Sequence, residues 1–389
     1  MAVPGAPAPR RIESIDLVRG AVMMLMALDH VRDFFGVPGN PTNLATASAP
    51  LFMTRWITHV CAPVFFLLMG TGAFLSSGRR TRGELSWMLL TRGLWLIVLE
   101  LTLVRCFAYQ FNFDYQVTLL LVLWALGWSL VALSALVWLP VWLLTAIGLL
   151  MIAGHNAFDS LRPASALWNI LHGPGFVVTG PRFTVFASYP LIPWIGVTAA
   201  GYGLGQVYRW DTDRRRRFLL NAGLAVTAGF IALRWSNFYG DPRPWADQAT
   251  TLFTALSFIN ANKYPPSLLF LMMTLGPALL FLRAVDGGTP RWLRPAVIYG
   301  QTPLFYFVLH FVVIHALAVV VCYATYGAAH WMFTSPDLGN YPFTPPPGWG
   351  FSLPVVYAIW IALVVALYPA CRWMAALKAR RRMWWTSYL

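Results

Sequence analysis

The sequence predicts an all-α fold, a polytopic membrane helix bundle of about ten transmembrane helices that forms one domain over residues 1–389. Hydrophobic residues make up 58% of the chain and charged residues only 11%, whereas soluble domains carry about 25% charged residues. The apolar residues come in blocks of about 20, the length that a helix needs to cross a bilayer. The 19 Trp, 15 Tyr and 26 Phe residues suit aromatic belts at both membrane interfaces.

The predicted spans follow one another along the whole chain. The fourth and fifth are joined with almost no loop at Leu139 and Pro140. Ten spans divide into five plus five, and because five is odd, two such halves would be inverted repeats. No repeat is visible in the sequence. The spans are predicted to start near Ile15, Trp56, Glu84, Val117, Pro140, Arg182, Arg217, Pro266, Pro295 and Phe351.

Basic residues predict the orientation of the bundle. The net charge is +14, but the basic residues stand in short loops beside apolar blocks and lack an RNA-binding signature, so we expect no nucleic-acid partner. Arginine-rich loops alternate with arginine-poor ones, and the positive-inside rule places the rich loops in the cytoplasm. We expect a multi-pass protein of the bacterial inner (plasma) membrane with both termini cytoplasmic. The rich loops hold Arg10, Arg11 and Arg19; Arg79, Arg80 and Arg82; Arg209 and Arg214 to Arg217; Arg283, Arg291 and Arg294; and Arg372, Lys378 and Arg380 to Arg382, whereas the opposite loops hold Arg55, Arg162, Arg182, Arg243 and Lys263.

The four cysteines predict neither a metal site nor a disulfide framework, because they form no C-x-x-C pair and no regular series. No metal ion is expected. Cys106 and Cys322 both fall near the outer ends of predicted spans, and a disulfide bridge between them is an alternative that the sequence does not decide. The other two cysteines are Cys61 and Cys371.

Ionisable residues inside a membrane are costly, so each one marks a candidate functional site. Asp29, His30, Arg32 and Asp33 end the first apolar stretch, and four such residues argue for a retained helix rather than a signal peptide. A rise of 1.5 Å per residue places Asp29 roughly 21 Å beyond Ile15, in the outer third of a core about 30 Å thick. A carboxylate beside a histidine can support a general base. The alternative is a helix end that meets the lipid headgroups.

A second histidine, His59, begins the second predicted span at a depth similar to that of His30. It is either part of the same site or an ordinary interfacial side chain. Gly70 and Gly72 in this span favour close helix packing, because glycine lets two backbones approach.

The third predicted span carries Arg92, Glu100 and Arg105. Arg92 and Glu100 are eight residues apart, about 12 Å along a helix, so each needs partners on other helices. Arg92 lies nearer the cytoplasm and suits a phosphate that arrives from that side, because the guanidinium matches phosphate geometry. The alternative is a structural ion pair inside the bundle.

Two further groups of polar residues occur late in the chain. His310 and His315 are five residues apart, about 140° around a helix, so they do not form an i, i+4 metal pair. We expect His310 to face the bundle. Lys263 and Tyr264 precede the eighth predicted span and either contact a polar acceptor or anchor the helix at the interface.

With these residues identified, the chain resembles bacterial members of the heparan-α-glucosaminide N-acetyltransferase family of membrane acyltransferases. The segment RIESIDLVRGAVMMLMALDH is similar to that family's opening D-x-x-R-G motif, here Asp16, Arg19 and Gly20, and to the Met-rich apolar run after it. The segment APVFFLLMGTGAFLS is similar to the family's Phe-Pro-aromatic run that ends in Met-Gly. The specific match ends after the second span, and the remainder is similar in layout.

The resemblance implies acetyl transfer across a membrane, with acetyl-CoA as the cytoplasmic acyl donor substrate and a glycan-type amine or hydroxyl as the acceptor on the far side. Asp29 stands where the family has Asn. The family's active histidine lies in the outer loop that follows, but this loop, Val37 to Pro50, contains no histidine. The family's acidic residue four positions before the proline is His59 here. The family's catalytic assignment therefore does not transfer directly.

From residue chemistry and depth we instead assign the base to His30, oriented by Asp29 or Asp33. Arg19 and Arg92 are expected to bind acetyl-CoA. Transfer can proceed directly or through an acetyl-histidine. The residues expected to bind the acceptor are His59, Arg32, Lys263, Tyr264 and His310.

The main alternative function is a transporter or flippase of a polar or lipid-linked solute, which would use the same buried charges as its pathway and need not bind acetyl-CoA. A non-catalytic membrane scaffold is a third alternative, disfavoured by the polar cluster near the outer face. The expected partners are the lipid bilayer and a small-molecule or glycan acceptor. The sequence does not decide whether the protein forms a homodimer.

The loop charges generate a prediction about orientation. Cysteine labels placed at Gly154 and Gly339 should react with a membrane-impermeant reagent added outside, whereas a label at Thr212, beside the arginine run, should not. Outside labelling at Thr212 would reverse the predicted orientation.

Overall fold

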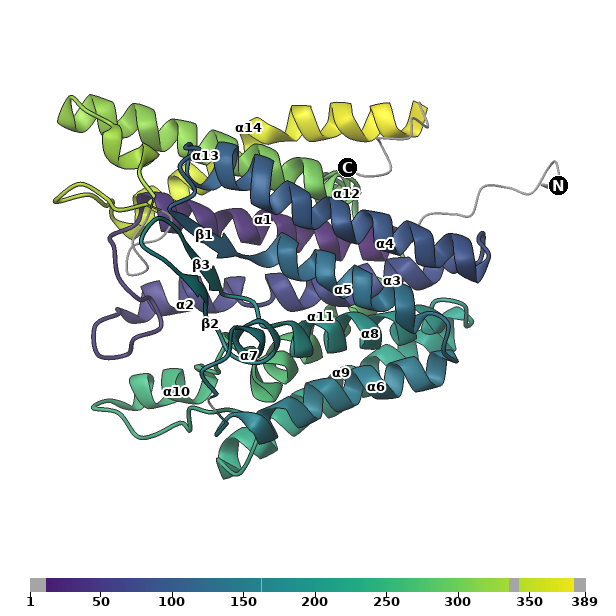
Figure 1. Cartoon of the computed structure of the whole chain (residues 1–389). Coiled ribbons are helices and arrows are strands. Elements are labelled where there is room, and N and C mark those ends of the chain that lie inside the picture. The colour runs from purple at the N-terminus through teal and green to yellow at the C-terminus, as the bar shows by residue number, and fades with distance from the viewer. Residues whose placement is uncertain (1–11, 162, 336–342, 381–389) are drawn as a thin grey trace.

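A computed structural model describes residues 12–161, 163–335 and 343–380. Among the positions considered above, Arg10, Arg11, Arg162, Gly339, Arg381 and Arg382 lie outside the described residues. Most long helices run in a similar direction and lie side by side as one bundle (Figure 1). The helices are α1 (Glu13–Phe35), α2 (Ala49–Thr58), α3 (Cys61–Ser77), α4 (Arg82–Leu99), α5 (Val122–Leu136), α6 (Val141–Gly154), α7 (Ala166–Leu171), α8 (Leu191–Val207), α9 (Thr212–Ser236), α10 (Thr251–Ile259), α11 (Leu268–Val285), α12 (Arg294–Gln301), α13 (Pro303–Tyr326) and α14 (Leu353–Arg380), with a π-helix at Glu100–Tyr109 and short 3-10 turns at His155–Phe158, Arg291–Leu293 and His330–Phe333.

The structure confirms a mostly helical membrane protein but not the predicted count of about ten spans. Each predicted span contains a helix. However, α1 carries the cluster of charges at its outer end, and α5 and α8 have only 15 and 17 residues. Within the described ranges, seven helical segments are long and apolar enough to cross a membrane: Ala49–Ser77, Arg82–Tyr109, Val141–Phe158, Thr212–Ser236, Leu268–Val285, Pro303–Tyr326 and Leu353–Arg380.

A small sheet interrupts the helical pattern. Strands β1 (Val117–Leu120), β2 (Gly175–Thr179) and β3 (Thr184–Ala187) form it in the order β1-β3-β2, with β1 parallel and β2 antiparallel to β3. The predicted fourth span begins with the residues of β1, and the predicted sixth span begins just before β3. These short runs are rich in β-branched and aromatic residues, which favours strands over helices.

The two ends of the bundle differ. The sheet lies at one end together with α2, α7 and α10, whereas the start of α1, the α3–α4 turn, the α8–α9 turn and the end of α14 lie at the other (Figure 1). The second end carries the arginine-rich loops, so the charge alternation in the sequence corresponds to a real division of the fold. That this end faces the cytoplasm stays a prediction.

Glycines set the distances between the central helices. A Cβ atom added to Gly20 on α1 would lie 1.6 Å from the carbonyl oxygen of Ala296 on α12, and one added to Gly70 on α3 would lie 1.9 Å from that of Thr198 on α8. Backbones therefore touch at both crossings, as is common in membrane bundles. The expectation of close packing holds for Gly70 but is wrong for Gly72, where an added Cβ meets no atom within 4 Å because the position borders a cavity.

This difference generates a prediction about stability. Gly70→Ala should destabilise the protein by about 1–3 kcal/mol or more, because the methyl group forces α3 and α8 apart. Gly72→Ala is the matched control on the same helix and should be neutral or slightly stabilising, because alanine favours helix by about 1 kcal/mol over glycine. Thermal unfolding of both variants in detergent checks this. Equal behaviour of the two would show that the close contact at Gly70 does not constrain the fold.

Candidate functional site

An outer cavity of about 670 Å³ lies at the end of the bundle that carries the sheet. Its walls come from the end of α1, the α2–α3 region, the segment before α11, the sheet and residues 343–349. The structure brings together here most of the residues that the sequence singled out. Seven of them line the cavity: Asp29, His30, Arg32, Asp33, His59, Lys263 and Tyr264.

The carboxylates of this cavity are paired with arginines. Arg32 Nη2 donates to Asp29 Oδ1 at 2.9 Å and to Asp33 Oδ1 at 2.6 Å. Arg55 from α2 donates to the other oxygen of Asp29. Both carboxylates therefore bond to guanidinium groups, and among the described residues neither makes the direct hydrogen bond to His30 that the predicted orienting role would use. The sequence predicts Arg55 only as an outer-loop charge, because its pairing with Asp29 depends on how α2 folds against α1.

The partner of His30 is instead His310. Nδ1 of His30 lies 2.7 Å from Nε2 of His310, and Nδ1 of His310 lies 2.7 Å from the carbonyl oxygen of Tyr306. A carbonyl only accepts, so Nδ1 of His310 donates to it, and in the neutral ring Nε2 then accepts the Nδ1 proton of His30. This leaves Nε2 of His30 with a lone pair. In this chain of bonds Nε2 of His30 can accept a proton and His310 fixes the ring of His30, whereas His310 itself does not line the outer cavity.

Aromatic rings hold this histidine pair in place. The His30 ring lies 3.9 Å from the ring of Phe311 and 6.4 Å from that of Phe307, measured between centroids. His310 is stacked on Tyr306 with centroids 5.0 Å apart. His310 is fully buried, which confirms that it faces the bundle interior.

Lys263 and Tyr264 form a polar wall of the outer cavity. The Lys263 ammonium lies 5.2 Å from the centroid of the Tyr264 ring, and this ring meets Tyr189 edge to face at 5.5 Å. Burial by itself raises the pKa of Tyr264, but the positive charges of Lys263 and Arg55 outweigh it and lower the pKa below its ordinary value. The ammonium group of Lys263 and the hydroxyl group of Tyr264 can therefore donate hydrogen bonds to a polar molecule in the cavity.

His59 lies in the same cavity as His30, at the junction of α2 and α3. Its ring meets Phe270 edge to face at 5.4 Å. The side chain is buried, and its Nδ1 has no hydrogen-bond partner in the part of the chain that the structure describes. A buried ring nitrogen of this kind can bind a substrate hydroxyl or amine, because such a bond offsets the cost of its burial.

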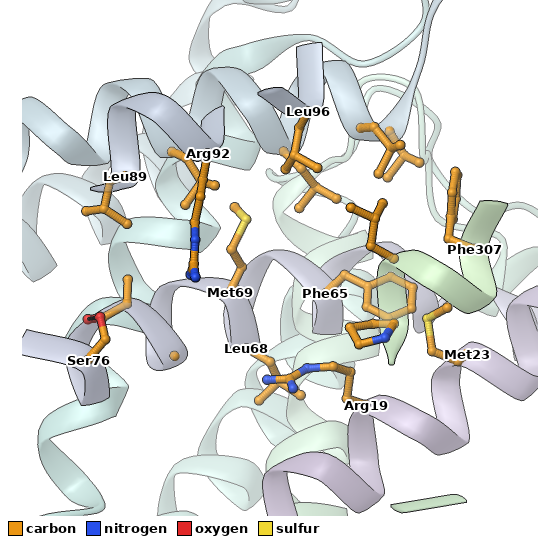
Figure 2. Close-up of a pocket in the computed structure, with 18 of the residues that line it drawn as sticks. Arg19, Met23, Phe65, Leu68, Met69, Ser76, Leu89, Arg92, Leu96 and Phe307 are labelled. Carbon is orange, nitrogen blue, oxygen red and sulfur yellow. Dashed lines mark hydrogen bonds between the residues drawn. The ribbon is translucent and has the colours of Figure 1, made fainter. Parts of the chain in front are cut away.

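A second, inner cavity of about 360 Å³ lies between α1, α3, α4, α5 and the start of α13. Its walls are apolar apart from Arg19, Arg92 and Ser76. Figure 2 shows Arg92 extending into this space from α4 and Arg19 from α1. The two arginines that the sequence assigned to one ligand therefore share one cavity.

Arg19 also connects helices. Its Nη1 donates to Asp16 Oδ1 and to the carbonyl oxygen of Gly300, both at 3.1 Å. Gly300 in turn packs against α1, where an added Cβ would lie 1.8 Å from the Asp16 carbonyl oxygen. The D-x-x-R-G motif thus fixes α1 against α12 while it presents an arginine to the inner cavity.

The remaining ionisable residues of the third predicted span have structural partners. The buried Glu100 carboxylate accepts the backbone N–H groups of Leu123 and Trp124 at 2.7 and 3.2 Å, which caps the start of α5. Arg105 pairs with Asp114 at 3.2 Å. Glu100 therefore caps a helix rather than forming the ion pair inside the bundle that the alternative predicted, and Arg105 forms its ion pair with a residue beyond the span.

Two other groups stay apart from the site. The ring nitrogens of His315 face the carbonyl oxygens of Ala108 and Met332 at 2.9 and 2.7 Å, so His315 connects α13 to its neighbours and does not pair with His310.

All four cysteines are free and buried, so the disulfide bridge between Cys106 and Cys322 does not form.

The inner and outer cavities share a lining residue. Val122 at the start of α5 lines both of them. His30 lines the outer cavity and its ring contacts Phe307, which lines the inner one. A reactive group in the inner cavity and a polar molecule in the outer cavity would therefore approach each other at His30.

Comparison with known proteins agrees with this arrangement. The catalytic model of the heparan-alpha-glucosaminide N-acetyltransferases matches residues 11–236, more than half of the chain and well beyond the two spans that carry the resemblance in the sequence. The matched region contains His30, Arg19 and Arg92 but ends before His310. A search of curated proteins gave no match. The chain belongs to the heparan-alpha-glucosaminide N-acetyltransferase catalytic family of membrane acyltransferases.

Proposed function

We propose that this protein moves an acetyl group from cytoplasmic acetyl-CoA to an amino or hydroxyl group of a glycan-type acceptor on the far side of a bacterial inner membrane. The observation that carries the proposal is the position of His30. It lies between an apolar cavity that contains two arginines and a polar cavity on the other side, with a ring nitrogen able to take a proton.

The inner cavity suits the acyl donor. Acetyl-CoA combines phosphates with a long thioester arm, and the cavity combines the guanidinium groups of Arg19 and Arg92 with apolar walls. Guanidinium groups form strong, directed hydrogen bonds with phosphate oxygens. The apolar walls would accept the arm and bring the thioester toward Val122 and His30.

The outer cavity suits a polar acceptor. It contains Lys263, Tyr264 and His59 as hydrogen-bonding groups, and Tyr109 and Trp349 as aromatic faces on which a sugar ring can lie. Its ionisable side chains Asp29, Asp33, Arg32 and Arg55 pair with one another, so they shape the cavity without adding a large net charge.

The chemistry follows from the hydrogen-bond chain. Nε2 of His30 removes a proton from the acceptor, and the acceptor nitrogen or oxygen attacks the thioester carbonyl carbon. The carbon–sulfur bond breaks, and the coenzyme A thiolate takes the proton from His30. In the route through an acetyl-histidine, the same nitrogen attacks the thioester first. Release of one equivalent of coenzyme A per chain without acceptor would identify the second route.

A transporter or flippase is the second candidate, because cavities that approach each other from both ends also suit alternating access. The two functions differ in their need for a donor. An acyltransferase must bind acetyl-CoA and needs the acceptor for repeated turnover of it, whereas a transporter need not bind it.

The inner cavity generates a prediction about donor binding. Arg92→Ala and Arg19→Ala should each weaken acetyl-CoA binding by about 1.5–3 kcal/mol, the contribution of a hydrogen bond to a charged group. Isothermal titration with purified protein checks this. Arg82→Ala is the matched control on α4, since Arg82 contacts the carbonyl oxygen of Trp138 and does not line the cavity.

Arg19 needs a second measurement because it also joins α1 to α12. Its variant should be compared with wild type in thermal unfolding before affinities are interpreted. Unchanged affinity in folded Arg92→Ala and Arg19→Ala proteins would remove both residues from the donor site.

The histidine pair generates a prediction about turnover. His30→Ala should lower acetyl transfer roughly 10²–10⁴-fold, the usual contribution of a general base, while acetyl-CoA binding survives. His310→Ala should lower kcat less, by roughly 5- to 150-fold with little change in KM, because it removes one buried hydrogen bond that orients the base. Steady-state assays with candidate amino sugars check both.

Two histidines serve as comparisons in that assay. His59→Ala should mainly raise KM for the acceptor if His59 only binds it, and His330→Ala should have no effect because His330 is exposed outside both cavities. If His30→Ala keeps wild-type turnover while His59→Ala abolishes it, then His59 is the base.

A further inference from the structure

A second cluster of titratable side chains lies outside both cavities, between α6 and β2. His155 follows α6 directly, Asp159 comes one helical turn later, and His172 caps the end of α7. One side-chain ligand atom from each of the three lies within 4.8 Å of the other two. Both histidines are almost completely buried, with 2% and 3% of their surface exposed.

The histidines of this cluster have fewer hydrogen-bond partners than their burial requires. Among the described residues, neither ring nitrogen of His155 makes a hydrogen bond of normal geometry, and Nδ1 of His172 also has none. The carbonyl group of Pro266 lies beside the His155 ring. An imidazole buried without partners is costly. A bound cation between the three side chains would remove that cost.

The distances suit a tetrahedral metal ion. Nε2 of His172 lies 3.1 Å from Oδ1 of Asp159, and two ligands of tetrahedral zinc with bonds of about 2.0–2.1 Å lie roughly 3.3 Å apart. An ion could therefore replace the proton between them with little movement. His155 lies farther away and would turn toward the ion.

Neighbouring groups hold these side chains as metal ligands are usually held. Asn156 Nδ2 donates to Oδ2 of Asp159 at 2.8 Å, which leaves Oδ1 free for the ion. Asn156 is itself fixed by the Leu268 N–H at the start of α11, again at 2.8 Å. A backbone carbonyl beside a histidine, as at Pro266, commonly accepts the ring N–H that does not face the metal.

We propose that His155, Asp159 and His172 bind one Zn²⁺ ion, with water as the fourth ligand. Two imidazoles and one carboxylate are a ligand set that zinc accepts well. The His172–Asp159 pair could exist without an ion, but it would leave His155 unexplained. The sequence predicts no metal site from its cysteines or from His310 and His315, and the H-x₃-D-x₁₂-H spacing here matches no familiar metal motif.

The ion would have a structural role. None of its three ligands lines the outer cavity, so it is remote from His30. It would instead join the end of α6, the end of α7 and, through Asn156, the start of α11. Pro174, two residues after His172, lines the outer cavity, so the zinc would fix one edge of the acceptor site.

Zinc content of the full-length protein tests the proposal. The protein is purified in detergent through a tag without histidine, stripped with a chelator, reloaded with Zn²⁺ alone and analysed by mass spectrometry for metals. Wild type should hold one zinc per chain, and zinc should raise its thermal unfolding midpoint. Asp159→Asn and His172→Gln should lower zinc affinity on the order of 100-fold or more, since even outer partners of a metal site contribute 10- to 100-fold.

His330→Ala is the matched control, because His330 is an exposed histidine that does not belong to the cluster and should leave zinc content unchanged. Wild type that takes up no stoichiometric zinc would overturn the proposal, whether or not any variant folds. Full zinc content in both ligand variants would overturn it as well.

Discussion

The pairing of buried charge is the constraint on which the outer half of this structure depends. Ions cannot stay unpaired inside an apolar bundle, because their desolvation costs several kcal/mol each. Arg32 and Arg55 therefore engage Asp29 and Asp33, and this network holds α2 against the end of α1. Because the carboxylates are occupied, the imidazole of His30 is free to bond with His310. The position of His30, the proposed base, thus depends on charges that take no direct part in the proposed chemistry.

Close backbone contacts supply the second requirement, a fixed spacing of the helices that carry the site. α1 touches α12 at Gly20 and Gly300, and α3 touches α8 at Gly70. Side chains in a membrane bundle gain little from leaving lipid, so small residues at such crossings set the packing. Where the glycine contact stops, as at Gly72, the inner cavity begins. The same helix surfaces therefore produce both the tight core and the space proposed for the acyl donor.

The segment between α6 and α8 gives the outer end of the bundle its own architecture. Its sheet pairs β1 with β3, and these strands lead into α5 and α8, while residues near them line the outer cavity. α7 in this segment has no fully buried residue, and only its partly buried Ile170 and Leu171 pack against the core. The hydrogen bond between Asn156 and Leu268 and the proposed zinc site would add polar cross-links to these apolar contacts. Rigidity there would preserve the shape of the acceptor cavity.

The sequence by itself determined the membrane class, the alternation of basic loops and the family, because these depend on composition, block length and local motifs. It also identified His30, His59, Arg19 and Arg92, since a polar residue in an apolar block is visible without a fold. It did not determine that His310 orients His30, that Arg55 occupies Asp29, or that His155 and His172 approach Asp159. Those contacts join residues up to 280 positions apart in the chain. Helix crossings and loop paths bring such residues together, and only the tertiary structure specifies them.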